Sequence, residues 1–304
     1  FEYHDYSDPT REGNSEKRRA STAVEPPSRK SVSLAAIPLE RATGKAFRPG
    51  PGRDFLYTHP MKSVGLRPRD VLYRDDVLLV INKPAGMPVH GSPMLEGRPT
   101  TILSAVRALT GRLVHPVHRL DRPVSGALLL ALDRNTLAAL ADAFAQRAVD
   151  KRYLAVVRGW SSESGVVDHP LLPPRDEREP GSKPRDAITQ YRRLARMEVP
   201  VAVPPYETAR YSLLALTPET GRRHQLRRHM KHISHHVVGD TTYGKGEHNR
   251  LFRSRFHCGR LLLHSRLLGF DHPAGGRVEV SAPLDEAFSR VANAFDWPSG
   301  VRSD

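Results

Sequence analysis

The stretch Val117–Leu132, "VHRLDRPVSGALLLAL", places one carboxylate, Asp121, between Arg119 and Arg122 and then continues as an apolar run. An apolar run of this length, entered through Pro and Gly, is typical of a buried strand. A carboxylate at the entrance to such a strand has to be paired, because an unpaired buried charge is costly or takes up a proton. The candidate partners are Arg119, Arg122, Arg222, Arg223, Arg227 and Arg228.

An aspartate paired with an arginine stays ionised at neutral pH and is then available as a nucleophile or as an electrostatic stabiliser. The alternative is an ordinary structural ion pair, which residue types alone favour over a catalytic role. Asp121 is therefore a candidate site residue whose role this stretch leaves open.

The patterns on either side of this stretch predict an α+β fold with a mixed, mainly antiparallel β-sheet and flanking helices, because strands follow strands with few crossover helices. Helix signals include Thr100 as an N-cap and Gly111 as a C-terminal residue of the first helix. Strands are expected within 71–84 (two, around an Asp-Asp turn), 151–160, 186–197, 208–218, 260–273 and 276–283. Helices are expected within 99–111, from about 135, and within 221–233 and 284–295.

The charge of the chain points to a polyanionic partner. The formal net charge is +14, of which residues 1–60, with 10 Lys+Arg and 8 Asp+Glu, supply only +2. A basic folded body favours a nucleic acid held against its surface, because each neutralised phosphate releases counterions. Solubility is the alternative explanation of the charge.

The first 65 residues predict a disordered N-terminal extension, because they are rich in Pro, Ser, Arg and Glu and lack a sustained hydrophobic period. Residues 66–304 are expected to form the catalytic domain. Met61, the first methionine, is a candidate start; a transit peptide is the rival, against which the eight acidic residues argue. No run of about 18 apolar residues occurs, so a membrane span is not expected. The single cysteine, Cys258, suits a reducing compartment, and the cytoplasm is expected unless residues 1–60 direct the chain to an organellar matrix.

Several motifs of cofactor and metal chemistry are absent from the sequence. It has no phosphate-binding G-x-x-x-x-G-K-[ST] and no H-E-x-x-H. His229, His232 and His236 would share a helical face, but histidines without a nearby acidic shell are typically a polar face, and no metal is expected. Ser125 has no G-x-S-x-G context that would make it a nucleophile. We therefore expect chemistry that needs no cofactor.

Five ordered stretches resemble the RluA family of pseudouridine synthases. The first is "HRLDRPVSGALLLA" around Asp121, and together the five cover roughly residues 70–283. The resemblance is greatest to members that modify uridine 65 of tRNA. The other four stretches are "VINKPAGMPVH" (80–90), "KRYLAVVRG" (151–159), "TGRRHQLRRHM" with "VVGDTTYG" (220–244) and "RLLLHSRLLGFDHP" (260–273).

The resemblance implies a pseudouridine synthase fold with a central RNA-binding cleft, and it implies roles for single residues. Asp121 would attack the target uridine at ribose C1′ or at C6 of the base, the two competing mechanisms. Arg227 would pair with Asp121, Tyr153 would stack on the base and take part in removing the C5 proton, and Arg119 would enter the RNA stack when the uridine is flipped out. Leu120 and Leu226 would line a dry pocket. Contacts with RNA phosphates are expected from Arg119, Arg122, Arg222, Arg223, Arg228 and Lys231.

Val124 departs from the family pattern, which usually has threonine at this position, so a hydroxyl is missing from the expected active-site loop. We nevertheless expect activity, because Asp121, Tyr153 and Arg227 are all present. The expected function is isomerisation of a specific uridine, most of all position 65 of tRNA, by a monomer that needs no nucleotide cofactor. The alternatives are a ribosomal-RNA pseudouridine synthase, and an RNA-binding assembly factor or chaperone with the same fold.

Overall fold

The structure, a computed structural model, describes residues 66–91, 100–174 and 177–296, which belong to one compact unit, Leu39–Asp304. The extension predicted over residues 1–65 lies outside the described residues. In the part of the chain that is described, none of the helices has the length and apolar character needed to cross a membrane.

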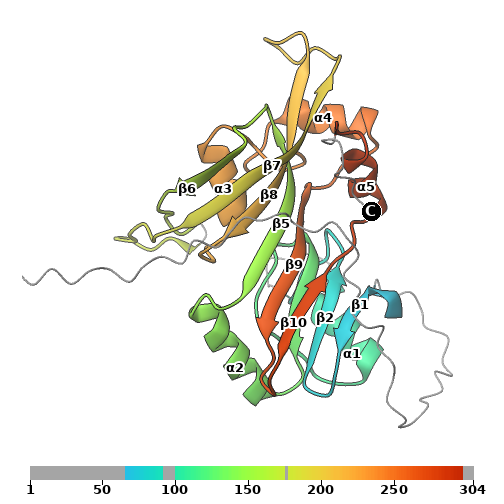
Figure 1. Cartoon of the computed structure of the whole chain (residues 1–304), viewed down its shortest axis with the longest axis vertical. Helices are drawn as coiled ribbons and strands as arrows, with labels where there is room; N and C mark the ends of the chain where they lie inside the picture. The colour runs from blue at the N-terminus through green and yellow to red at the C-terminus, as the bar shows by residue number, and fades with distance from the viewer. Residues whose placement is uncertain (1–65, 92–99, 175–176, 297–304) are drawn as a thin grey trace, which may run out of the picture. The chain divides into compact units, whose positions relative to one another are not determined.

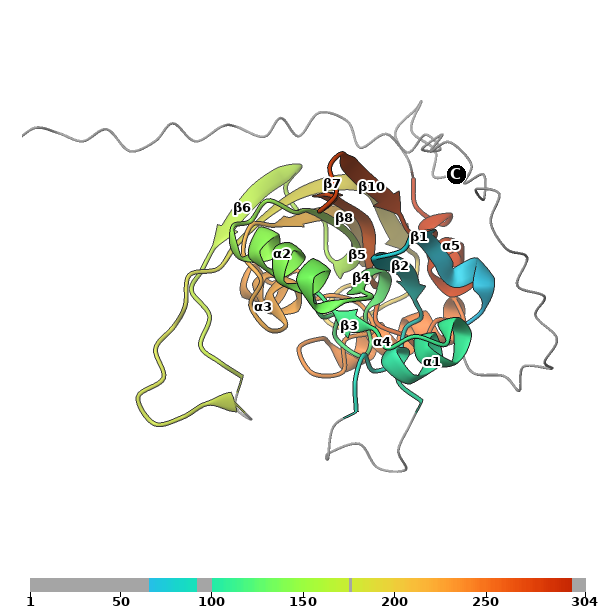
Figure 2. The same cartoon turned by 90° about the horizontal axis from the view of Figure 1, so that it is seen from below.

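In the described residues, ten strands form one sheet with the order β1-β2-β4-β9-β5-β8-β7-β6, with β3 paired to β4 and β10 to β9 (Figure 1; β3 and β4 are labelled in Figure 2). Every pair is antiparallel except β4 with β9. The predicted mixed, mainly antiparallel α+β fold is therefore confirmed. The strands are β1 (Val71–Arg74), β2 (Leu78–Lys83), β3 (His115–Pro116), β4 (Ser125–Ala131), β5 (Asp150–Arg158), β6 (Ser164–Asp168), β7 (Ile188–Val199), β8 (Ala209–Pro218), β9 (Leu263–Asp271) and β10 (Arg277–Ser281).

The strand β4 is the apolar run that follows Asp121, and every one of its residues is buried. Leu128 and Leu130 pack into a core cluster on one face, and Ala127 and Leu129 pack into a second cluster on the other. This is why the run is continuously apolar instead of alternating. At its start, Gly126 has φ +108°, and a Cβ there would collide with the backbone of Ser265 on β9, so glycine is required for the close approach of the two strands.

The helices are mostly those that the sequence predicts, with one correction at a cap. Thr101, not Thr100, caps the first helix, because its side chain accepts the N–H of Ser104; Gly111 ends that helix with φ 69°, as expected. The helices are α1 (Ile102–Thr110), α2 (Arg134–Ala145), α3 (Gln225–His232), α4 (Gly246–Arg255) and α5 (Glu286–Ala292), with a short 3₁₀ turn η1 (Pro68–Asp70).

Apart from the 3₁₀ turn η1, three described elements have no counterpart in the sequence-based expectations: β3, β6 and α4. The strand β3 has only two residues, and β6 is a short edge strand whose Val166 is exposed, so neither carries a strong pattern. Helix α4 buries only Leu251 and Phe252, which is too narrow a stripe to give a helical period.

Helix α3 covers one face of the half-sheet made by β5, β8 and β7. Its Leu226 and Met230 join the core cluster that contains Leu214 and Leu216 of β8. Seen from below, α3 lies against the inner side of the curved strands β6, β7 and β8 (Figure 2). This packing brings Arg227 of α3 to the loop that carries Asp121.

Candidate active site

Asp121 lies in a tight turn just before β4 that is held by backbone hydrogen bonds. The Val124 N–H donates to the Asp121 carbonyl (3.0 Å) and closes the turn. The next residue, Arg122, is tied to the loop after β2 in both directions: its carbonyl accepts from the Gly86 N–H (2.8 Å), and its Nε donates to the Gly86 carbonyl (3.0 Å). The buried Lys83 Nζ donates to the same Arg122 carbonyl (3.1 Å). The carboxylate of Asp121 is therefore presented by a rigid backbone.

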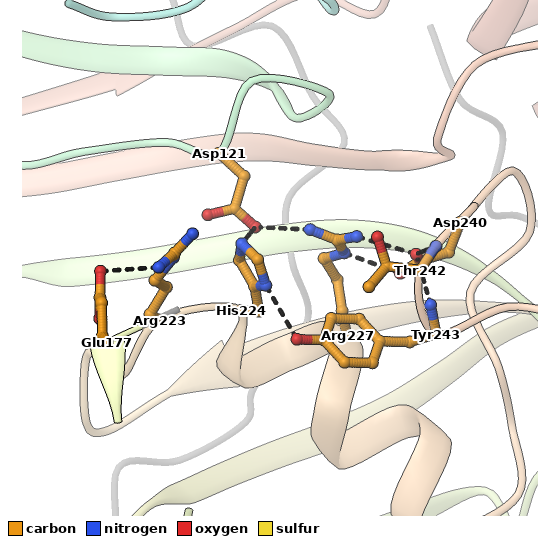
Figure 3. A network of polar contacts seen from close by, with 8 residues as sticks. All are labelled: Asp121, Glu177, Arg223, His224, Arg227, Asp240, Thr242 and Tyr243. Atoms are coloured by element: carbon orange, nitrogen blue, oxygen red, sulfur yellow. Dashed lines mark hydrogen bonds and ion pairs between the residues drawn. The ribbon is translucent and has the colours of Figure 1, made fainter. Parts of the chain in front are cut away.

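Arg227 of α3 bridges two carboxylates, as Figure 3 shows. Its Nη1 donates to Asp121 Oδ2 (3.1 Å), while its Nε and Nη2 donate to the two oxygens of Asp240 (2.7 and 2.8 Å). Asp240 also accepts the backbone N–H groups of Thr242 and Tyr243, both at 2.9 Å. The side chain of Arg227 is 5% exposed and that of Asp240 only 1%, against 16% for Asp121. Asp240 thus fixes the guanidinium, and Asp121 has one oxygen left to face the pocket.

The electrostatics keep this bridge ionised. Burial alone would raise the pKa of Asp240, but the hydrogen bonds from Arg227 and from the Tyr243 N–H hold it below its usual value. Burial likewise works against the charge on Arg227, but Asp240 and Asp121 together raise its pKa. Arg227 therefore supplies a permanent positive charge beside Asp121.

His224 is a second neighbour of Asp121, and sequence reasoning did not single it out. Its Nε2 lies 3.8 Å from Asp121 Oδ2, and its Nδ1 is hydrogen-bonded to the hydroxyl of Tyr243 at 3.0 Å. Burial lowers its pKa, although the charge of Asp121 opposes the shift, so the imidazole is neutral at neutral pH. His224 adopts a left-handed conformation (φ 56°) at the start of α3, a strained geometry that a non-glycine residue rarely adopts.

The loop that leads to His224 is held by a buried glutamine. Gln225 Nε2 donates to the Ile188 carbonyl (2.9 Å), and Gln225 Oε1 accepts from the Thr220 hydroxyl (2.7 Å) and the Arg222 N–H (2.9 Å). These contacts connect the start of α3 to β7. The strained conformation of His224 is therefore imposed by its surroundings.

A pocket of about 440 Å³ opens beside Asp121. Tyr153 of β5 lines it, and burial, together with the charge of Asp121, raises the pKa of its phenol to about 12. Of the residues that the sequence proposes for the site, those that line the pocket are Arg119, Leu120, Asp121, Tyr153, Arg222, Arg223, Leu226 and Arg227.

Three predicted RNA-contact residues lie outside this pocket. Arg122 is occupied in the turn described above, and Arg228 Nη1 donates to the Leu172 carbonyl at 2.8 Å. Lys231 is exposed, with its Nζ 5.9 Å from the ring of Tyr243. The pocket residues that sequence reasoning missed include His118, Phe144, Lys151, Glu177 and His224.

Arg223 at the pocket is ion-paired with Glu177, its Nη1 lying 2.7 Å from Glu177 Oε1 (Figure 3). Glu177 belongs to the segment between β6 and β7, a segment without a regular hydrophobic period, so no sequence signal places it here. The pair brings an acidic group to a pocket whose other lining charges, apart from Asp121, are basic.

His229 and His232 of α3 contact groups of the protein away from Asp121. His229 Nδ1 is hydrogen-bonded to the Thr189 hydroxyl (2.9 Å), and its Nε2 donates to the His169 carbonyl (3.0 Å). The ring of His232 stacks on His169 with centroids 3.7 Å apart. In the described ranges, no group of three or more His, Cys, Asp or Glu side chains is placed to hold a metal ion.

Comparisons with known proteins place this geometry in a family. The family profile described as RNA pseudouridylate synthase matches residues 77–232, which include Asp121, Tyr153 and Arg227. The chain belongs to the RNA pseudouridylate synthase family. As a pseudouridine synthase it is an isomerase, and its sequence and fold agree with those of other members.

Named relatives support this membership along most of the chain. The tRNA pseudouridine synthase C of Haemophilus ducreyi is 45% identical over 233 residues, which are 75% of this chain and 96% of that protein. The protein of the same name from Vibrio cholerae is 41% identical over 76% of this chain and 98% of its own. Among solved structures, human RNA pseudouridylate synthase domain containing 1 is 25% identical with a TM-score of 0.60, covering 77% of this chain and 90% of that chain.

Proposed function

We propose that this pseudouridine synthase acts on tRNA, that its target is the uridine at position 65, and that Asp121 is its nucleophile. The observation that carries the proposal is the carboxylate of Asp121 at the edge of a pocket, held by Arg227 on one side. The tRNA substrate rests on the names of the relatives that match along the chain.

Asp121 has the properties that the reaction needs. The carboxylate bonds to C1′ or to C6, and the N1–C1′ bond breaks. The base turns and C5 bonds to C1′, the bond to the carboxylate breaks so that Asp121 is regenerated, and N1 gains a proton as C5 loses one. The guanidinium of Arg227 lies beside the carboxylate, with its Nη1 3.1 Å from Asp121 Oδ2, and the pocket limits screening by bulk water. Atoms and charge balance within one nucleotide, so the isomerisation needs no oxidant, reductant or nucleotide cofactor.

Tyr153 and Arg119 have complementary parts in this proposal. Tyr153 lines the pocket and is aromatic, so its ring can stack on the flipped base. With a pKa of about 12, its hydroxyl is protonated at neutral pH, so it can accept the C5 proton only after it has given up its own proton. Arg119 is exposed beside the pocket, where a planar cation can fill the gap that the uridine leaves.

The remaining parts of the proposal concern the oligomeric state and the cellular compartment of the enzyme. The active species is proposed to be a monomer. The single cysteine suits the reducing cytoplasm, where tRNA is matured.

Tritium release from tRNA carrying [5-³H]uridine tests the reaction, because C5 loses its proton only when the base is rejoined. The wild type should release tritium, and Asp121→Asn should release none while its affinity for tRNA stays within a few-fold. Asp76→Asn removes an exposed carboxylate from the turn between β1 and β2 and is the matched control, with activity expected to be unchanged. Retained product in Asp121→Asn refutes the assignment of the nucleophile.

Pseudouridine mapping of total RNA with and without the gene tests the substrate. Loss of a single tRNA position supports the proposal, and loss of a ribosomal position replaces tRNA by ribosomal RNA. No change in any RNA would favour the assembly-factor alternative. For Arg119→Ala, activity should fall more on native tRNA than on a less structured RNA, and equal losses would contradict a role for Arg119 in base flipping.

A further inference from the structure

Trp160, which follows β5, lies on the surface with two arginine side chains over its ring. The guanidinium carbon of Arg210 is 4.3 Å from the ring centroid, and that of Arg196 is 5.4 Å away. Trp160 is 38% exposed, and the side chain of Arg210 is 53% exposed. The indole N–H donates to the Met197 carbonyl at 3.4 Å. The ring therefore fixes two cations at the surface without cancelling their charge.

The charges around Trp160 leave this cluster basic. Glu198 Oε1 accepts from Arg210 Nε at 3.0 Å and from the Thr208 hydroxyl at 2.6 Å, and these hydrogen bonds lower the pKa of Glu198. Arg196 has no acidic side chain in ion-pair contact among the described residues. Arg210 retains donors beyond Nε. The cluster has a net positive charge and unused N–H groups at the surface.

The cluster lies on the same face of the sheet as the pocket. Leu216 of β8 is directly opposite Tyr153 of β5, and the register continues without a shift as far as Arg158. Arg210 is six residues before Leu216, so its side chain points to the same face. On β7, Arg196 and Glu198 are opposite Ser212 and Arg210 and share that face. Six residues of strand separate the two ends by about 20 Å.

We propose that Trp160, Arg196 and Arg210 form a second RNA-contact surface, which binds the backbone of the substrate about 20 Å from the flipped uridine. The inference rests on the proposed action on tRNA and deepens it. The planar guanidinium groups of Arg196 and Arg210 match the geometry of a phosphate, and the exposed part of the Trp160 ring is available for contact with a ribose or a base. A protein partner is less favoured, because the rest of the chain already carries a large positive charge.

The surface would select RNA by size and shape. A substrate that fills the pocket reaches Trp160 only if folded RNA extends about 20 Å from the target uridine, passing over α3 and the loop that follows it, because these cover the sheet in between. A minimal RNA that carries the uridine but is too short to span this separation would occupy the pocket alone. Recognition of a large folded RNA then requires both contacts at once.

Binding to tRNA by protein that carries Asp121→Asn tests the surface without turnover. In this background, Arg196→Ala with Arg210→Ala should raise the Kd for tRNA about tenfold and reduce the slope of log Kd against log salt by about 1.8, as expected for two lost phosphate contacts. Trp160→Ala should also weaken binding. Glu198→Gln should strengthen it, because it removes a negative charge from the surface.

The matched control is Arg69→Ala with Arg74→Ala, which removes two exposed arginines from η1 and β1 at the opposite edge of the sheet. It should leave the Kd unchanged. The minimal RNA should bind the wild type and the cluster variants equally. Thermal unfolding of each variant checks that the fold is intact, and the exposed arginine variants remain informative if Trp160→Ala does not fold.

Two failures are distinguishable. If the Asp121→Asn protein does not bind tRNA at all, the proposed function fails. If it binds tRNA but the arginine variants match the control, only the second surface is overturned, and the cluster would then be examined for a protein partner. Equal losses on tRNA and on the minimal RNA also overturn it, because they would place the effect at the pocket.

Discussion

Replacing Asp240 should destabilise the protein far more than replacing Asp121, although both carboxylates bind the same arginine. Asp240→Asn places an amide N–H₂ opposite one guanidinium donor, keeps one neutral acceptor oxygen, and leaves the buried charge of Arg227 with Asp121 as its one ionic partner in the described site. Removing one partner of a buried ion pair costs about 3 to 5 kcal/mol. In a folded body of this size that corresponds to a melting temperature lower by about 6 to 20 °C.

The matched variant is Asp121→Asn, which removes one partly exposed contact and leaves both Asp240 contacts in place. Its melting temperature should stay close to that of the wild type, while its activity is lost. Asp240→Asn should lose both stability and activity, because Arg227 is no longer fixed beside Asp121. Urea unfolding and tritium release on the same preparations separate the two effects.

The contribution of Asp240 to the stability of the protein should depend on pH in a definite direction. Since the folded protein holds the pKa of Asp240 below its usual value, this carboxylate contributes stability that is fully present above the unfolded pKa of about 4. That contribution is lost as the pH falls through the lower folded value. The stability difference between wild type and Asp240→Asn should therefore shrink below about pH 4. Equal melting temperatures for Asp240→Asn and wild type at pH 7 would refute the reasoning.

Three further outcomes are expected. Tyr243→Phe removes the hydroxyl that contacts His224 Nδ1, so kcat should fall about fivefold with KM unchanged in steady-state assays, as expected for one hydrogen bond; a change in KM alone would contradict this. Val124→Thr should leave kcat within about threefold, because a backbone hydrogen bond already closes the Asp121 turn; a tenfold gain would show that the missing hydroxyl matters. Burial and the charge of Arg260 lower the pKa of Lys83 to about 7. As the pH rises from about 7 to 10, the free energy of unfolding of the wild type should therefore increase relative to that of Lys83→Met in urea unfolding. A difference between the two proteins that does not change with pH would count against this shift.

Much of the fold was predictable because its strands and helices have strong local patterns. The run from Gly126 to Leu130 is apolar since both faces of β4 are covered, and α3 was visible from its own periodicity. The parallel contact between β4 and β9 had no local signal, because it depends on strands that are far apart in the chain. Helix α4 was not predicted because it buries only two residues, and a helical hydrophobic pattern appears in a sequence only where a wider face of the helix is buried.

The sequence predicted the site residues to which the family resemblance assigns a role. It did not predict the residues that hold them in place, because those contacts form only in the folded structure. Asp121 and Arg227 were singled out together, and the structure places them 3.1 Å apart; their chemical roles stay predictions. His224, Asp240 and Tyr243 stand inside the quoted stretches, yet their function as supports arises only when α3 and the loop before α4 meet. Glu177 belongs to a segment with no pattern at all.

The position of β9 in the sheet has a consequence for how the protein is made on the ribosome. This strand is synthesised after β4 and β5, yet it lies between them. Until residues 263–271 have left the ribosome, β4 and β5 each present an unpaired edge, which is a hazard for misassociation. Asp121 and Arg227 can be synthesised long before the sheet that holds them in register is closed. The two halves of the sheet that carry Asp121 and Arg227 can therefore be joined through β9 only after residues 263–271 have been synthesised.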